Sequence, residues 1–183
     1  MKDDLTAAIN NSSIGKPTLD KQPRLSVEMQ TLLTKQIMNE MHSCNLYKQL
    51  AGWLDDNDWT FGAKLFMKYG NEETTHADKV IDYMFERNCK VDILAIEKPV
   101  ISVKNVRDVL LASLEHEILV SNQWKTIAAM AMKEADLTTF GIAQWFINEQ
   151  IEEESKFRDF LFKLNLNMPE YELDEEFKDA LEG

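Results

Sequence analysis

The sequence is poor in glycine and proline, with 6 and 4 among its 183 residues. An all-β fold needs many tight turns, and these two residues dominate turns, so their scarcity argues against a sandwich or barrel. Only two cysteines are present, Cys44 and Cys89, which excludes a disulfide framework and favours a reducing, cytoplasmic environment. The sequence contains neither an apolar run long enough to span a bilayer nor the apolar segment of a secretory signal.

Positive charge is also scarce, because 20 Lys and Arg stand against 32 Asp and Glu, for a formal net charge of −12. This imbalance argues against nucleic acid and anionic membranes as partners, and it suits a protein that handles cations. Hydrophobic residues make up 44% of the chain, which is long enough for one domain with a sizeable core. We predict that domain over residues 25–183. The Asn, Ser, Gly, Pro and Lys content of residues 1–24 predicts a flexible N-terminal extension.

Apolar residues recur every three or four positions in four long stretches, which predicts four helices. Their approximate ranges are 27–54, 59–87, 106–134 and 138–164, and a short acidic helix follows Pro169. The aspartate-rich segment between the first two helices ends the first and can cap the second. The segment between the second and third helices lacks helical periodicity and is long for a loop. Two short turns and one long link predict an all-α, antiparallel four-helix bundle with one long crossover and a short fifth helix.

Each of the four long helices carries at least one polar residue in the middle of its apolar face. In chain order these residues are Glu40, Glu73, His76, Glu117 and Glu153. Unpaired buried carboxylates are costly and repel one another, and we expect no Lys or Arg on the same faces to neutralise them. A divalent or trivalent cation would do so. Oxygen ligands combined with an imidazole suit iron and manganese.

The spacing of Glu73 and His76, three residues apart, lets both side chains reach one metal ion from the same helical face. A single Glu-x-x-His is usually structural, and a single Glu on an apolar face usually extends its carboxylate to water. Mid-helix acids on all four helices together favour two metal ions bridged by a shared carboxylate, with open positions for oxygen. A metal-free helical scaffold with acids at its boundary stays an alternative.

Four stretches, NEMHSCNLYKQLAGW, NEETTHADKVIDY, LEHE and AQWFINEQIEEESKF, resemble the four helices of ferritins in order and spacing. The likeness runs from about Val27 to the C-terminus and is greatest to bacterial non-haem ferritins. It implies an iron-storage protein and ferroxidase that oxidises Fe(II) to Fe(III) with oxygen or hydrogen peroxide at a di-iron centre inside each subunit. The ferric mineral would be stored in a homo-oligomeric cage of 24 subunits. The alternative is a stand-alone di-iron peroxidase of the rubrerythrin kind, although the Cys-x-x-Cys pairs of its partner domain are absent.

The resemblance also implies which residues form the di-iron centre. Glu40, Glu73 and His76 match the ligands of the first iron, with Glu73 as the bridging carboxylate. Glu117 and Glu153 match ligands of the second iron. The resemblance implies a further set of residues around this pair: Gln150 beside the second iron, Tyr47 near the centre, Trp145 as an electron donor, and Glu72, Glu149 and Glu152, together with Glu153, at a third iron site.

Three departures from the patterns of related ferritins bear on the expected cofactor and on the route of iron entry. Bacterioferritins have a second Glu-x-x-His on the fourth helix, where this chain has Gln150 and Glu153, and a haem-binding methionine where it has Thr74. Haem is therefore not expected. The acids that line the threefold channel of animal ferritins are replaced by Phe140 and Ala143, so the route by which iron would enter stays open.

Overall fold

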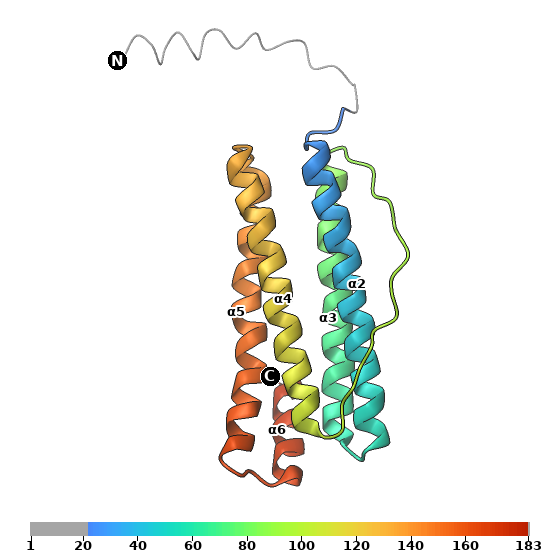
Figure 1. The fold of residues 1–183 in the computed structure, drawn as a ribbon, viewed down its shortest axis with the longest axis vertical. Helices are drawn as coiled ribbons and strands as arrows, with labels where there is room; N and C mark the ends of the chain where they lie inside the picture. Colours follow the sequence, from blue (N-terminus) through green and yellow to red (C-terminus); the bar gives the residue numbers. More distant parts are fainter. Residues whose placement is uncertain (1–21, 183) are drawn as a thin grey trace, which may run out of the picture.

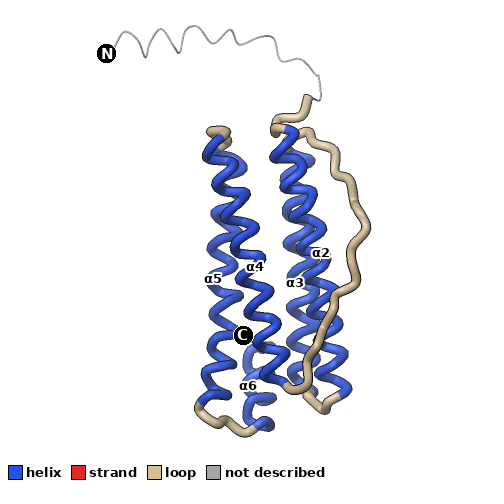
Figure 2. Tube along the Cα trace, in the orientation of Figure 1, coloured by secondary structure: helices blue, strands red, loops and turns tan. Residues whose placement is uncertain are grey.

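The computed structural model describes residues 22–182, so all but the last three residues of the predicted extension lie outside the described range. Four long helices run side by side and a short fifth helix follows (Figure 1). Within residues 22–182 there is no strand, as Figure 2 shows, which confirms the all-α bundle. The helices are α2 (Val27–Asp56), α3 (Thr60–Glu86), α4 (Val106–Lys133), α5 (Leu137–Asn165) and α6 (Glu170–Glu182).

Three of the helices begin at a residue whose side chain caps the first turn. Ser26 Oγ accepts a hydrogen bond from the backbone N–H of Met29 at 3.0 Å, at the start of α2. Asn105 Oδ1 accepts from the N–H of Asp108 at 2.9 Å, at the start of α4. The carboxylate of Asp136 accepts from two N–H groups in the first turn of α5. Such caps satisfy backbone donors that have no partner inside the helix.

Helix α3 is capped from a distant part of the chain. Trp59, at its N-cap position, has no side-chain hydrogen bond that caps the first turn, so the preceding aspartate cluster does not cap α3 as expected. Instead, Asp174 of α6 accepts from the N–H groups of Phe61, at 3.1 and 3.2 Å, and Gly62, at 2.9 Å. Gly62 permits this approach, because a Cβ there would lie 3.0 Å from the ring of Phe177. The fifth helix is therefore joined to the bundle by charge as well as by packing.

The connections match the predicted topology. Helix α2 packs mainly on α3, and α4 packs mainly on α5, with a short turn inside each pair. The crossover between the pairs spans residues 87–105 and runs the length of the bundle beside α2 (Figure 1). Helix α6 folds back against the lower ends of α3 and α5. No helix in the described range is long and apolar enough to cross a membrane.

The buried core consists of two apolar clusters. The lower cluster, near α6, includes Phe66 and Phe177, and the upper cluster, at the opposite end, includes Leu33 and Trp124. In each long helix the residues between these clusters include buried polar side chains. This polar belt comprises Gln36, Glu40, Ser43, Glu73, His76, Glu117, Ser121, Gln150 and Glu153. Because the belt is enclosed by apolar packing above and below, its charges are poorly solvated.

Candidate metal centre

Three of the predicted ligands meet in the polar belt. Glu40 comes from α2, and Glu73 and His76 come from α3, one helical turn apart. Each side chain offers one ligand atom, and these three atoms lie within 4.8 Å of one another. The residues are 1%, 5% and 7% exposed, so the cluster is almost closed to water. Two carboxylates and an imidazole this close together can all bind one cation.

The two oxygens of the Glu40 carboxylate have different surroundings. Its Oε1 accepts hydrogen bonds from Gln36 Nε2 at 2.8 Å and Trp124 Nε1 at 3.0 Å. With both carboxylates ionised, its Oε2 is buried and has no hydrogen-bond donor among residues 22–182; when one of the two is protonated, Glu40 and Glu73 hydrogen-bond to each other. Burial, with the nearby charge of Glu73, raises the pKa of Glu40 to about 8. A buried oxygen without a donor is unfavourable, and a cation at the cluster would satisfy it.

Glu73 and His76 complete this half of the centre. His76 Nδ1 lies 3.4 Å from Glu73 Oε2. Burial, and then the charge of Glu117, raises the pKa of Glu73 well above its ordinary value. The imidazole packs edge-on against Phe146 and Trp145, with ring centroids 5.6 and 6.0 Å away. The aromatic rings hold the imidazole toward the carboxylates, so the cluster is preorganised.

The second half of the centre is built around Glu117 of α4. Tyr47 Oη donates a hydrogen bond to Glu117 Oε1, and Gln150 Nε2 donates to Oε2 at 2.7 Å. Burial raises the pKa of Glu117 to about 7, although these two hydrogen bonds lower it. Burial, and then the charge of Glu117, raises the pKa of Tyr47 well above its ordinary value, so the phenol keeps its proton at neutral pH. Both oxygens of Glu117 therefore have neutral donors.

The next carboxylate, Glu153 of α5, already has a cationic partner. It is 8% exposed, and its Oε1 accepts a hydrogen bond from Lys156 Nζ at 2.8 Å. Burial by itself would lower the pKa of Lys156, but the carboxylates of Glu153, Glu72 and Glu152 raise it above its ordinary value. The expectation that no lysine would neutralise these acids is therefore wrong here. It failed because a lysine three residues after a buried glutamate can reach back to it along the same face.

A cavity of about 440 Å³ opens beside this second half, between α3 and α5. All four acids that the resemblance assigns to a third iron site line this cavity. Trp145, which is 37% exposed, lies on its wall with Lys79 Nζ 3.9 Å from the ring centroid. Its lining residues are Glu72, Thr75, His76, Lys79, Trp145, Glu149, Glu152, Glu153 and Lys156. Because His76 belongs to both, the cavity connects the buried cluster to the surface.

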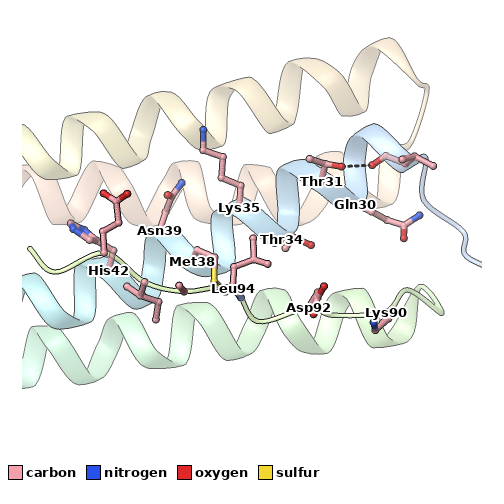
Figure 3. A pocket seen from close by; sticks show the side chains of 14 residues that line it. Gln30, Thr31, Thr34, Lys35, Met38, Asn39, His42, Lys90, Asp92 and Leu94 are labelled. Atoms are coloured by element: carbon pink, nitrogen blue, oxygen red, sulfur yellow. Dashed lines mark hydrogen bonds between the residues drawn. The ribbon is translucent and has the colours of Figure 1, made fainter.

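A larger cavity, of about 820 Å³, lies between α2 and the crossover (Figure 3). The crossover is attached there by a hydrogen bond of 3.2 Å from the N–H of Leu94 to Met38 Sδ. None of the predicted ligands lines this cavity. Although this cavity is larger, we do not assign the functional site to it, because the group of converging metal-ligating side chains among the described residues lies elsewhere.

The structure also shows the surroundings of Thr74, Phe140 and Ala143, three positions at which this chain departs from related family patterns. Thr74 is exposed on α3, and its Oγ1 donates to Cys44 Sγ at 3.4 Å. Ala143 is fully buried, and Phe140 packs against the upper core. The start of α5 therefore presents no carboxylate at either of these two positions.

Three residues of the centre were missed by sequence reasoning. Gln36 and Trp124 donate to Glu40, and Lys156 donates to Glu153. Gln36 and Lys156 could have been found from their spacing, because each lies four or three residues from its partner on the same helix. Trp124 offered no such signal, since its partner is on another helix.

Fold and site together define a four-helix bundle with a carboxylate and histidine cluster at its centre. The family model for the ferritin-like domain, "Ferritin", matches residues 30–167 of this chain. The protein belongs to the ferritin family.

Similar proteins agree with this assignment. The chain is 32% identical over 142 residues to the bacterial non-heme ferritin of Campylobacter jejuni, covering 78% of this chain and 85% of that protein. It is 33% identical over 141 residues to a probable bacterial non-heme ferritin-like protein of Haemophilus influenzae, covering 77% and 86%. Among solved structures, an open pore ferritin from Archaeoglobus fulgidus superposes with a TM-score of 0.81 at 30% identity, covering 84% and 96%.

Proposed function

We propose that this protein is an iron-storage ferritin with ferroxidase activity, which binds Fe(II) at the buried centre and oxidises it with oxygen or hydrogen peroxide. The observation that carries the proposal is the meeting of Glu40, Glu73 and His76, with a buried oxygen of the ionised Glu40 that has no hydrogen-bond donor in the described part of the chain. Iron is the substrate. The family assignment and the relatives named non-heme ferritins support iron in preference to manganese.

In this proposal Glu40, Glu73 and His76 hold the first iron, and Glu73, as the bridging carboxylate, also binds the second iron. Glu117 and Glu153 hold the second, and Tyr47 and Gln150 position Glu117. Each Fe(II) gives up one electron, and oxygen takes up the two electrons and two protons to form hydrogen peroxide. With hydrogen peroxide as the oxidant, two electrons and two protons yield two waters. Carboxylate ligands favour the reaction because they stabilise the more highly charged Fe(III) product.

Storage requires an enclosed space, so we further propose that the chain forms a cage of 24 identical subunits in the cytoplasm. The exposed apolar side chains of the helices, among them Leu119, Leu137 and Ile151, are 53%, 77% and 62% exposed in the single chain. Subunit contacts would bury such groups. The net charge of −12 would attract Fe(II) to the shell and gives no support to a nucleic-acid or membrane partner.

The catalytic part is tested by adding Fe(II) to the metal-free protein without oxygen, then mixing with air and following ferric absorbance in the near ultraviolet. Wild type should oxidise the first iron added within seconds, and Glu73→Ala should be slow. Glu86→Ala, at an acid near the end of the same helix and outside the cluster, is the matched control and should be as fast as wild type. Equally slow traces for wild type and Glu73→Ala would rule out the ferroxidase.

The storage part is tested by light scattering after size exclusion. A particle of several hundred kilodaltons is expected, since each chain is 21.2 kDa. A dimer that oxidises iron rapidly would instead indicate the stand-alone di-iron redox enzyme.

A further inference from the structure

We propose that the Lys156 ammonium occupies the place of the third iron, so that this chain binds a pair of metal ions tightly and excludes the third. The inference deepens the proposed function, on which it rests. It concerns how many metal ions the centre binds, and not whether the centre oxidises Fe(II).

The first support is the position of the ammonium among the acids. Lys156 Nζ lies 2.8 Å from Glu153 Oε1, where a cation bound by that carboxylate would be. Glu72 and Glu152 line the same cavity as Lys156. These three are among the acids that the family resemblance gives to a third iron. The ammonium therefore already provides them with a positive charge.

The second support is that the lysine is held in place. Its side chain is 35% exposed, and its Nζ also lies 5.3 Å from the centroid of the Tyr69 ring. A carboxylate on one side and an aromatic face on the other are both favourable neighbours for an ammonium. A metal ion at the third position would have to displace this contact or tolerate a fixed positive charge beside it.

The other lysine of the cavity has a different position. Lys79 Nζ lies 3.9 Å from the centroid of the Trp145 ring, and no ion pair joins it to a carboxylate among the described residues. Lys156 is thus the residue that sets the number of ions bound. Within residues 22–182, no Lys or Arg forms an ion pair with the buried cluster of Glu40, Glu73 and His76.

The experiment measures Zn²⁺ binding to the metal-free protein by calorimetry, because Zn²⁺ is not oxidised. Wild type and Lys156→Arg, which keeps the charge, should bind a pair of ions per chain tightly. Lys156→Met should gain a further ion, bound at least about tenfold more tightly than any third ion in wild type. Lys163→Met is the matched control: it removes an ion-paired lysine two turns further along α5, outside this cavity, and should leave the number unchanged.

Crystals soaked in Zn²⁺ give an independent readout. Anomalous density between Glu72, Glu152 and Glu153 is expected in Lys156→Met and not in wild type. A third ion in wild type, with the lysine turned aside, would overturn the proposal, as would an unchanged number of ions in Lys156→Met. If wild type still oxidises Fe(II) rapidly in those cases, the ferroxidase stands and only the role of Lys156 fails. Wild-type crystals decide the question even if Lys156→Met does not fold.

Discussion

The two halves of the metal centre solve the problem of converging acids in different ways. In the half around Glu40, the buried half, both carboxylates are buried; Glu40 accepts hydrogen bonds from two neutral donors on one oxygen, and its other oxygen has no donor among residues 22–182. In the half around Glu153, the open half, a lysine supplies positive charge and a cavity opens beside the carboxylates. The difference teaches that burial of acids does not by itself define a metal site. The half without an ion-paired lysine depends on a bound ion for all of its charge compensation, and the other half depends on one only in part.

The largest effect should come from removing the imidazole of the buried half. We expect His76→Ala to slow rapid Fe(II) oxidation by about 100-fold, or about 2.7 kcal/mol of barrier, because a metal ligand is lost. Stopped-flow absorbance measures the rate, and circular dichroism checks that the helices persist. His42→Ala is the matched control, since His42 lies on α2 and lines the cavity beside the crossover. Equal rates for both variants and wild type would remove the contrast between the halves.

The buried carboxylates of the two halves, Glu40 and Glu117, should also determine how stability depends on pH. The pKa values of Glu40 and Glu117 are raised to about 8 and about 7, so the folded protein binds these protons more tightly than the unfolded chain. Stability of the metal-free protein should therefore fall as pH rises from about 4.5 to about 8, by about 2 kcal/mol or more. Thermal unfolding across this range measures it.

The control for the pH experiment is Glu40→Gln, which keeps the shape of the side chain and cannot ionise. Its stability should depend less steeply on pH and should exceed that of the wild type near pH 8. Saturating Zn²⁺ should reverse the trend in wild type, because the ion favours the ionised carboxylates. A metal-free wild type that is more stable near pH 8 than near pH 5 would contradict the assignment.

A smaller effect is expected from the tryptophan that orients Glu40. Trp124→Phe keeps the ring that stacks on Phe146, with centroids 3.8 Å apart, but removes the N–H that binds Glu40 Oε1. We expect about tenfold weaker Zn²⁺ binding at the first site, in line with losses of groups that support metal ligands. Trp53→Phe, at the edge of the lower core, should bind as wild type does. Identical affinities in the two variants would show that the N–H contributes nothing.

The smallest effect should come from an acid of the open half. Glu152 is exposed, so its charge is screened by water and salt. Glu152→Gln should change the initial rate of Fe(II) oxidation by less than about threefold. Multiple-turnover oxidation assays measure it beside His76→Ala. A loss as large as that of His76→Ala would mean that the open half is as essential as the buried one.

Much of the fold could be predicted from periodicity. The predicted helices begin and end within a few residues of the observed ones, and the crossover lies where periodicity was absent. The cap of α3 could not be predicted, because Asp174 is far away in the sequence and approaches only when α6 docks. At the centre, Glu40 and Glu73 were predicted to point inward and are buried, although their roles as iron ligands stay proposals.

The sequence by itself determined which residues face the interior, because a helical repeat of 3.6 residues assigns each side chain to one side of its helix. Only the tertiary structure decided which of these residues meet. Trp124 reaches Glu40, and Tyr47 reaches Glu117, from different helices. Such pairs depend on how far each helix is shifted and rotated against its neighbours, and that follows from the packing of whole helix surfaces, which periodicity does not specify.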